Sequence, residues 1–474
     1  MEAGRFAVKD LNKKSAPAQA YPTKVLQFGD GNFLRGFADW MIDILNENAA
    51  FKGSIATVAP LRRGRPSVSD PQEGRYHVVL RGLSNGERVD DVRLITCLDY
   101  YVNPYDEYDK FIEVADVPSL QLIISNTTEA GITFLADDIN KDEAPDSFPA
   151  KVTQLLYRRF VTFDGDVSKG LTFLPCELIE SNGDALRKIV LQYAQHWSLD
   201  SDFSNWVNTA CTFTNTLVDR IVTGYPGDYA QEIAKRTAYH DERIVAAEPY
   251  HLWVIEAKED INRVFPVAGS GLNVKFVSDL TPYRTSKVRI LNGAHTAMTL
   301  VGYLRGLRTV REAVEDGWMS QFLERLIRDE VIPTIPLPES EVVQYAGAVF
   351  ERFHNPEIRH ELKSIALNSV SKFRARLLPT LLDQYNNTQK LPPHLIYAFA
   401  SLIVFYRGHW KGESLPVSDS PEAITAFRAC WHLPDRPDVV GLLSNTSLWG
   451  TDLNTINNLS TQLSAEVSGI LAGE

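Results

Sequence analysis

The sequence predicts an α/β domain followed by a mostly α-helical domain. Up to about residue 280, short apolar and β-branched runs alternate with helical segments, which is typical of a parallel sheet covered by helices. From Lys287 onward, apolar residues recur with the helical period almost throughout. Because 474 residues exceed one ordinary hydrophobic core, we predict a first domain over residues 1–285 and a second over residues 286–474. The helices predicted in the second domain cover residues 310–328, 341–353, 358–378, 393–406 and 421–430.

The composition is that of an ordinary soluble globular protein, with 44% hydrophobic and 23% charged residues. A net charge of −12 argues against nucleic acid or an anionic membrane as the main partner. Cys97, Cys176, Cys211 and Cys430 lack the spacing of a metal site or a disulfide framework, so we expect reduced thiols, no metal centre and a cytoplasmic protein. We expect the first twenty residues to form a loose arm, with no signal peptide and no membrane span in the chain.

A strand, a glycine-rich turn and a helix open the first domain. The strand pattern is Thr23–Phe28, and Gly29 after it permits a tight turn. Gly31 lets the backbone approach a pyrophosphate, which the N–H groups of the following helix would face. The third glycine of a dinucleotide fingerprint is missing, because Leu34 takes its position and Gly36 comes two residues later. The pattern therefore indicates either a nucleotide site or an ordinary glycine turn.

The end of the second predicted strand, Ser54–Ala59, bears on the choice between NAD and NADP. A fingerprint for NAD usually has an acidic residue there to bind the ribose hydroxyls. Here Arg62, Arg63 and Arg65 follow instead, and they either bind a 2′-phosphate or form a solvated basic loop. Spacing alone leaves the cofactor open.

Polar residues follow two later strands. The strand Leu120–Ser125 ends in Asn126–Glu129, which either border a nicotinamide or form a simple strand-to-loop transition. Asn182 follows another strand, where it either faces a substrate or belongs to a turn. Asp219 and Arg220 stand among aliphatic residues, and buried charges of this kind form either an ion pair or a support for a site.

One predicted helix, starting at Lys287, carries a lysine, an asparagine and a histidine. Lys287, Asn292 and His295 stand at positions i, i+5 and i+8. In an α-helix, His295 lies roughly 80° and Asn292 roughly 140° from Lys287, so all three look out of one broad face. A cation, an amide and an imidazole suit a carbonyl or hydroxyl substrate. The alternative is a surface lysine, a capping asparagine and a histidine satisfied within the fold.

Together and in this order, these stretches resemble the polyol-specific long-chain dehydrogenases, the family that includes mannitol dehydrogenase. The family's lysine-x4-Asn-Gly-x-His motif is present from Lys287 to His295, and its Val-Asp-Arg-Ile signature is Val218–Ile221. Its nucleotide loop resembles Gly29–Arg35. The resemblance extends from about residue 20 to 410. Two departures are Thr223, where Pro or Ser is common, and the missing acidic residue after the second strand.

The resemblance implies a Rossmann-like first domain, a helical second domain and metal-independent hydride transfer with NAD. It implies that Lys287 is the general acid/base and that Asn292 and Asn182 hold the carbonyl oxygen. His295 would orient a substrate hydroxyl, and Asp219 would support the site. The residues expected to bind the cofactor are Gly29, Asp30, Gly31, Asn32, Phe33, Arg35, Asn126, Thr127, Thr128 and Glu129.

Within the family, the chain most closely resembles a member that reduces a keto sugar acid in galacturonate breakdown. Members acting on an isomeric sugar acid or on a neutral polyol are the alternatives. A sugar acid needs a cation for its carboxylate. Lys372, Arg374 and Arg376 offer one, and Lys372 stands where the family places a substrate-binding base. The alternative is a solvated basic helix face. The sequence leaves the oligomeric state open.

Overall fold

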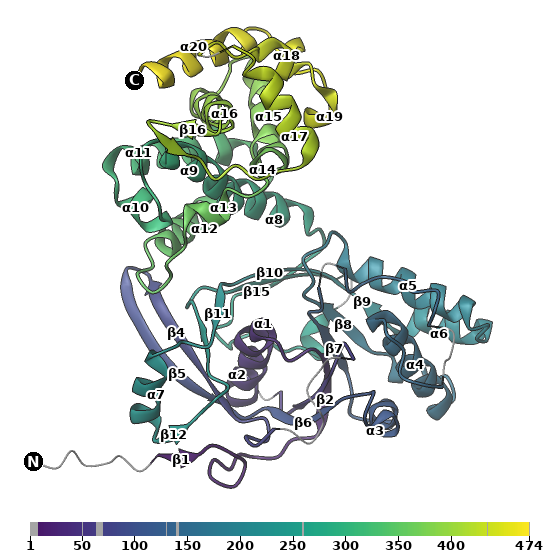
Figure 1. The fold of residues 1–474 in the computed structure, drawn as a ribbon. Helices are drawn as coiled ribbons and strands as arrows, with labels where there is room; N and C mark the ends of the chain where they lie inside the picture. Colours follow the sequence, from purple (N-terminus) through teal and green to yellow (C-terminus); the bar gives the residue numbers. More distant parts are fainter. Residues whose placement is uncertain are drawn as a thin grey trace, which may run out of the picture. The chain divides into compact units, whose positions relative to one another are not determined.

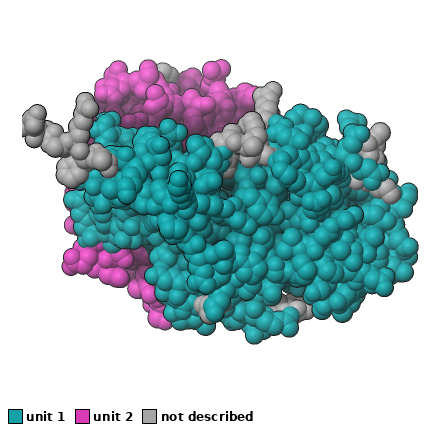
Figure 2. Space-filling view, turned by 90° about the horizontal axis from the view of Figure 1, so that it is seen from below, with its two compact units in different colours: residues 1–82, 88–280 teal, residues 83–87, 281–474 magenta. Residues whose placement is uncertain are grey.

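The computed structural model describes residues 8–49, 51–62, 70–128, 130–138, 142–257, 260–433 and 435–473. The chain forms two compact units, coloured separately in Figure 2. The first contains residues 1–82 and 88–280, and the second contains residues 83–87 and 281–474. Apart from residues 83–87, the second unit begins with helix α8 (Thr281–Ser286), a few residues before the boundary predicted at 285.

A six-stranded parallel sheet forms the centre of the first unit (Figure 1). Its order is β6-β3-β2-β7-β8-β9. Along the chain, β2, β3 and β6 follow one another toward one edge of the sheet. The next strand, β7, lies beside β2, and β8 and β9 continue from it toward the other edge. In doubly wound folds, ligands bind where the order reverses, at the carboxyl ends of such strands. The strands are β2 (Thr23–Phe28), β3 (Ser54–Val58), β6 (Leu98–Val102), β7 (Leu122–Ser125), β8 (Thr172–Pro175) and β9 (Thr212–Phe213).

Both faces of this sheet are covered by helices. Along β2, Val25 packs into an apolar cluster with the helix that follows the glycine loop, whereas Leu26 and Phe28 pack into a second cluster with α4 to α6. Successive side chains of a strand point to opposite faces, so both faces are buried. The helical segments of the first unit are α1 (Asn32–Leu34), η1 (Arg35–Asp39), α2 (Trp40–Asn48), α3 (Tyr108–Glu113), η2 (Val114–Asp116), α4 (Phe148–Thr162), η3 (Val167–Lys169), α5 (Asn182–His196), α6 (Ser201–Ala210), α7 (Tyr229–Thr237) and η4 (Ile261–Arg263).

Smaller sheets complete the first unit, with the orders β11-β13-β4-β5, β10-β14-β15 and β1-β12. The pair β1-β12 corrects one prediction, because it fixes the start of the chain. Leu11 and Ala16 are buried, and Arg75 donates a hydrogen bond to the Ala16 carbonyl. The expected loose arm is therefore wrong for residues 8–16, while residues 17–20 are exposed without helix or strand and residues 1–7 lie outside the described part. The strands are β1 (Lys9–Asp10), β4 (Tyr76–Ser84), β5 (Glu87–Ile95), β10 (Asn215–Asp219), β11 (Val222–Gly224), β12 (Tyr239–His240), β13 (Val245–Ala247), β14 (Leu252–Glu256) and β15 (Val274–Val277).

The second unit is built almost entirely of helices around one apolar cluster. The described residues include no helix long and apolar enough to span a membrane. The elements after α8 are η5 (Lys287–Asn292), α9 (Gly293–Leu304), α10 (Val310–Glu315), α11 (Gly317–Arg325), η6 (Leu326–Val331), η7 (Ile332–Thr334), α12 (Glu339–Phe353), α13 (Leu362–Ile365), α14 (Ser369–Arg376), α15 (Leu378–Thr388), α16 (Pro393–Phe405), β16 (His409–Trp410), β17 (Glu413–Ser414), α17 (Pro421–Cys430), α18 (Val439–Leu443), α19 (Thr446–Trp449), η8 (Leu453–Thr455) and α20 (Leu459–Ala472).

The predicted fold class, an α/β domain followed by a helical domain, is confirmed. Two predicted helices are divided, however. Residues 310–328 break at Asp316, whose extended backbone ends α10 and whose side chain caps α11. Residues 358–378 break at Asn368, which has a left-handed backbone (φ 56°) just before α14. Apolar periodicity continues across both breaks, so the sequence pattern does not reveal them.

Candidate active site

The loop after β2 needs glycine at two positions for different reasons. Gly29 has φ +108° and donates its N–H to the Val58 carbonyl of β3 (2.9 Å). A Cβ there would lie 3.4 Å from the carbonyl oxygen of Asn126. A Cβ on Gly31 would meet no described atom within 4 Å. Gly29 is therefore required by the backbone, whereas Gly31 leaves open space above the start of the helix.

That open space suits a phosphate group. The segments α1, η1 and α2 run on continuously from Asn32 to Asn48, and Gly31 at their N-terminus has no side chain to cap the first N–H groups. Uncapped N–H groups and the positive end of the helix dipole attract anions. The residues present therefore fit the pyrophosphate of a dinucleotide.

Gly36 has a packing role that differs from that of the missing fingerprint glycine. A Cβ on Gly36 would lie 2.9 Å from Cγ1 of Val222 in β11 and 3.1 Å from Cγ1 of Val245 in β13. The third fingerprint glycine normally permits close packing of the helix on the parallel sheet, and Leu34 holds that position here. Gly36, two residues later, instead lets the helix pack closely on the four-stranded sheet that contains β11 and β13. Between the two residues the helix has entered the π-helical turn η1.

Asp30, Asn32 and Arg35 are predicted to bind the cofactor. Contacts with one another or with Arg243 hold all three. Arg35 Nη2 donates to Asn32 Oδ1 (2.7 Å), and Arg35 Nη1 donates to the Arg243 carbonyl (2.6 Å). The Arg243 guanidinium lies 3.5 Å from the Asp30 carboxylate. The ring of Phe33 stacks on Phe37 instead, at 4.9 Å between centroids. These contacts hold the loop in place, and direct contact with a cofactor stays a prediction.

The carboxyl group of Glu177, just after β8, bonds to residues at the carboxyl end of the neighbouring strand β7. Glu177 Oε1 accepts from the backbone N–H of Thr127 (3.0 Å) and from Thr127 Oγ1 (3.1 Å). Glu177 Oε2 accepts from Ser125 Oγ (3.0 Å), and Asn126 Nδ2 donates to the Cys176 carbonyl (2.8 Å). Burial raises the pKa of Glu177. We did not identify Glu177 from the sequence, although an acidic residue directly after a buried strand was a usable signal.

The remaining residues of this loop are described in part. Thr128 accepts a hydrogen bond from Gly131 N–H (2.7 Å). A Cβ on Gly131 would lie 2.1 Å from Thr127 Oγ1, so only glycine lets the chain fold back so closely. Glu129 lies outside the described residues.

Asn182 begins α5 instead of forming a turn, and its side chain is fully buried. Its Nδ2 donates to the carbonyls of Pro175, Glu177 and Thr216 at 3.1–3.2 Å. Its Oδ1 accepts from the N–H groups of Thr216 and Gly183. The amide thus ties β8, α5 and β10 together, and both its N–H groups are engaged. Its predicted contact with a substrate oxygen stays a prediction.

Arg220 supports the helix that carries the nucleotide loop. It donates to the carbonyls of Gly36 and Glu248, both at 2.9 Å, and its guanidinium lies 4.2 Å from the ring centroid of Trp40. Burial lowers the pKa of Arg220 to about 9. Arg220 thus joins two backbone segments, and the neighbouring Asp219 is buried at the end of β10. The predicted support of the site by Asp219 stays a prediction.

In the second unit, the lysine motif starts in a π-helical turn, η5, which covers Lys287–Asn292. At its end, Gly293 N–H donates to the carbonyl of Val288, five residues earlier. Because π-helical bonds join residues i and i+5, Lys287 and Asn292 lie closer to one face than the roughly 140° of an α-helix. The regular α-helix predicted for this stretch is wrong here. π-Helical turns are frequent at functional sites.

Lys287, Asn292 and His295 are all half-buried, whereas Ile290 and Leu291 of the same helical segment are buried. None of the three side chains is therefore fully exposed, and none is fully buried in the core. The His295 ring packs against two aromatic rings, with centroids 4.7 Å from Phe353 and 5.0 Å from His360. Burial lowers the pKa of His360.

Helix α14 lies close against the start of α9. A Cβ on Gly293 would lie 3.2 Å from Leu377 Cδ2 and 3.5 Å from the Arg376 carbonyl oxygen. Arg376 Nη1 also donates to Thr296 Oγ1 (3.3 Å), and Thr296 Oγ1 donates to the Asn292 carbonyl (2.9 Å). A guanidinium group is thus linked to the residue that carries the predicted amide donor.

The three predicted carboxylate ligands of α14 differ in their surroundings. Lys372 Nζ donates to the Ile365 carbonyl (2.8 Å), and the pKa of Lys372 is lowered by burial and by the charge of Arg376. Burial also lowers the pKa of Arg376. Arg374 donates to the Ser447 carbonyl (3.3 Å) in the exposed surface. The charge of Arg376 thus acts on Lys372, and we call these two residues the cationic pair; the charge of Asp419 also acts on Lys372, in the opposite direction.

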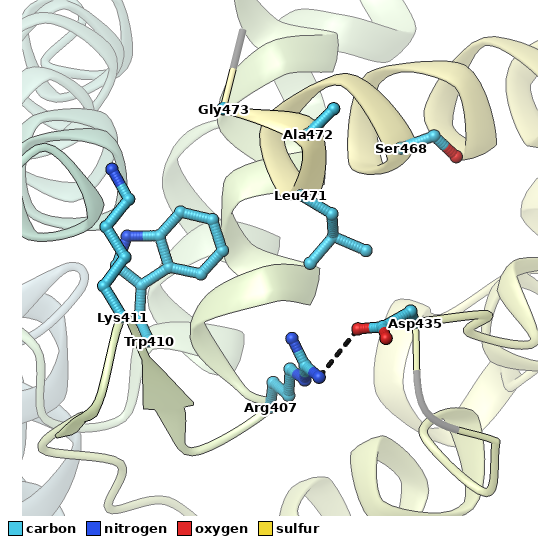
Figure 3. A pocket seen from close by; sticks show the side chains of 8 residues that line it. All are labelled: Arg407, Trp410, Lys411, Asp435, Ser468, Leu471, Ala472 and Gly473. Atoms are coloured by element: carbon cyan, nitrogen blue, oxygen red, sulfur yellow. Dashed lines mark ion pairs between the residues drawn. The ribbon is translucent and has the colours of Figure 1, made fainter.

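Two cavities of the second unit contain none of the predicted site residues among their lining side chains. The larger, about 600 Å³, lies beside the end of α20 (Figure 3). In it, Arg407 pairs with Asp435 (2.7 Å). The smaller, about 260 Å³, is lined by Trp318, Gln321, Phe322, Arg325, Pro393, His394, Tyr397 and Glu466. Within the described residues, no group of three or more His, Cys, Asp or Glu side chains is arranged to hold a metal ion.

Comparison with known families matches both halves of the chain. Residues 23–265 match the mannitol dehydrogenase Rossmann domain, and residues 279–471 match the mannitol dehydrogenase C-terminal domain. The altronate oxidoreductase of Yersinia enterocolitica is 41% identical over 471 residues, which cover 98% of each chain. The altronate oxidoreductase of Cronobacter sakazakii is 42% identical over 471 residues, again 98% of each chain.

Solved structures share the fold. A substrate-free D-sorbitol dehydrogenase is 20% identical, with a TM-score of 0.80 over 98% of both chains. The Pseudomonas fluorescens mannitol 2-dehydrogenase in ternary complex with NAD and D-mannitol is 20% identical, with a TM-score of 0.69 over 98% of this chain and 97% of that one. The chain belongs to the mannitol dehydrogenase family, and it is an oxidoreductase that acts on CH–OH groups of polyols or sugar acids with a nicotinamide cofactor.

Proposed function

We propose that the chain is an altronate oxidoreductase (tagaturonate reductase), which interconverts D-altronate and D-tagaturonate with NAD in galacturonate breakdown. The observation that carries this proposal is its 41% identity, across 98% of both chains, to a relative named altronate oxidoreductase. A sugar acid differs from a neutral polyol in its carboxylate. The cationic pair Lys372 and Arg376 supports a substrate with that group.

The position of the cationic pair also suits this substrate. Arg376 reaches Thr296, one turn after Asn292 on the helix that begins with the lysine motif. A carboxylate bound by Lys372 and Arg376 would leave the rest of the sugar chain beside Asn292 and Lys287. Charge-assisted hydrogen bonds to a carboxylate are stronger than neutral ones and orient the bound molecule.

The proposed chemistry places one proton and one hydride on a ketone. NADH, when bound, supplies the hydride. Lys287 gives a proton to the ketone oxygen during reduction and takes it back from the hydroxyl during oxidation. Asn292 donates a hydrogen bond to the same oxygen and stabilises the negative charge that develops there. His295, held against Phe353, orients a neighbouring hydroxyl of the substrate.

One contact after β3 supports NAD over NADP. Arg62 lies 3.2 Å from the Asp146 carboxylate and 4.5 Å from the ring centroid of Tyr105. A 2′-phosphate bound at Arg62 would also approach the Asp146 carboxylate, whose negative charge disfavours the 2′-phosphate alternative for this residue. Arg63 and Arg65 lie outside the described residues.

A substrate panel tests the proposal. The purified protein is assayed with D-tagaturonate, D-fructuronate and D-fructose, each with NADH and with NADPH. We expect the highest kcat/KM with tagaturonate and NADH, because the relatives at 41–42% identity are named altronate oxidoreductases and the cationic pair suits a carboxylate. A higher value with fructuronate would make the chain a fructuronate reductase (D-mannonate oxidoreductase), and a higher value with fructose would make it a neutral polyol dehydrogenase. A preference for NADPH would overturn the cofactor proposal alone.

A further inference from the structure

We infer that Glu177 is a positioning residue for the nicotinamide end of the cofactor, acting through Thr127. The inference rests on the proposed dinucleotide cofactor, and its test needs no sugar substrate. Glu177 lies just after β8, at the carboxyl edge of the parallel sheet, and is 3% exposed. Its carboxyl group is directed at the neighbouring strand end, β7, and not at solvent.

The bonds of Glu177 fix one short segment. Oε1 accepts both hydrogen-bond donors of Thr127, its backbone N–H and its hydroxyl, at 3.0 and 3.1 Å. Oε2 accepts the Ser125 hydroxyl at 3.0 Å. A threonine held at both donors cannot rotate about χ1 or tilt its peptide plane without breaking a bond to a buried carboxyl group, which is costly.

The segment Ser125–Thr127, which Glu177 holds, contacts the end of β2 and the first residue of the nucleotide loop, Gly29. Asn126 N–H points to the Phe28 carbonyl at the end of β2 (3.4 Å). The Asn126 carbonyl oxygen lies 3.4 Å from the Cβ position of Gly29. Glu177 therefore fixes the segment Ser125–Thr127 at the carboxyl end of β7, which we call the wall. The strand order reverses between β2 and β7, and a dinucleotide would lie there.

Gly131 packs against Thr127, and Asn182 bonds to the backbone of Glu177. Gly131 closes over Thr127, because any Cβ at that position would lie 2.1 Å from Thr127 Oγ1. The Asn182 amide donates to the Glu177 carbonyl at 3.1 Å, so the backbone of Glu177 is itself fixed.

Two substitutions separate the geometry of Glu177 from its charge. In Glu177→Gln, the amide oxygen still accepts both Thr127 donors, and the amide N–H groups can donate to the Ser125 hydroxyl. In Glu177→Ala, Thr127 loses both acceptors. Glu180→Ala is the matched control, because it removes an exposed carboxylate three residues further along the same loop.

Binding of NADH and of ADP-ribose, which lacks the nicotinamide ring, is measured by fluorescence and calorimetry. We expect Glu177→Ala to weaken NADH binding about 10-fold and to leave ADP-ribose binding within about 2-fold, because only the nicotinamide end loses its wall. Glu177→Gln should restore NADH binding, and Glu180→Ala should resemble the unmodified protein. Thr127→Val, which keeps the N–H donor, should give an intermediate loss.

Three results would overturn the inference. Equal weakening of NADH and ADP-ribose would reduce Glu177 to a support of the whole nucleotide domain. Failure of Glu177→Gln to restore binding would show that charge and not geometry matters. Unchanged NADH binding in a folded Glu177→Ala protein would leave Glu177 without a role in positioning. A different preferred sugar in the substrate panel would not affect this test, because binding of NADH and of ADP-ribose is measured without a sugar.

Discussion

Lys287 is the first residue of the π-helical turn η5 and is half-buried, as a group that exchanges protons with a bound substrate must be. We expect Lys287→Ala to lower kcat about 1,000-fold, the usual scale for losing a general acid/base. NADH binding, measured by fluorescence, should survive because the nucleotide loop lies in the other unit. Lys390→Ala, at an exposed lysine, is the control. Turnover within about 10-fold of normal would reject the assignment.

Lys372 differs from its neighbour Arg374 in a way that permits a paired test. Lys372→Met should raise the KM for tagaturonate about 10- to 100-fold, because one charge-assisted bond to the carboxylate is lost. Slow turnover of fructose, which has no carboxylate, should change little. Arg374→Met should leave both values unchanged, since Arg374 bonds to the Ser447 carbonyl. Equal effects of Lys372→Met on both sugars would remove the carboxylate contact from the proposal.

Asp39 predicts how stability depends on pH. It is buried in η1 and accepts a hydrogen bond from Tyr76 (2.8 Å), yet burial raises the pKa of Asp39 to about 7. An unfolded aspartate titrates near about 3.9, so between about pH 4 and about pH 7 the unfolded chain releases a proton that the folded chain keeps. The contribution of Asp39 to stability is thus full below about pH 4 and lost as the pH rises through about 7.

We therefore expect Asp39→Asn to flatten the fall in the free energy of unfolding between about pH 5 and about pH 8. Urea unfolding at a series of pH values measures the slope. Asp109→Asn, at an exposed carboxylate on α3, is the control and should retain the slope of the unmodified protein. Identical slopes for Asp39→Asn and the unmodified protein would show that Asp39 has an ordinary pKa.

At the scale of elements, two glycines of one helix start should respond in opposite ways. Gly36→Ala puts a Cβ 2.9 Å from Val222 and should lower the free energy of unfolding by about 1–3 kcal/mol. Gly31→Ala meets no described atom within 4 Å and has an ordinary extended backbone, so stability should hold. Its methyl group instead occupies the phosphate space and should weaken NADH binding roughly 10-fold. Urea unfolding and fluorescence titration of both variants measure this, and the reverse pattern would contradict the arrangement.

Sequence patterns predicted the bounds of some helices and strands correctly and missed breaks in others. The strand Thr23–Phe28 and the helix Pro421–Cys430 have the bounds that apolar spacing predicts. The same spacing missed the breaks at Asp316 and Asn368, because the apolar positions continue across both. It also missed the π-helical turn η5, since a widened turn depends on what packs around the helix and not on local preference.

At the scale of the whole molecule, the sequence determined the fold class, the order of the motifs and the family. These depend on local periodicity and on residue types at short spacing, both of which can be read along the chain. Site chemistry was read in the same way, through the Lys287–His295 motif and the glycine loop. The substitutions of Lys287, Lys372, Gly31 and Thr127 test this chemistry at four of the predicted site residues.

Only the tertiary structure decided which partner each buried polar group takes. Arg35 donates to the carbonyl of Arg243, 208 residues away along the chain, and Thr127 bonds to Glu177, 50 residues away. The amide of Asn182 joins three backbone segments, a role that its sequence context does not indicate, while its contact with a substrate stays a prediction. A buried donor needs some acceptor, but the nearest one is set by how strands and helices pack, and no local spacing contains that information.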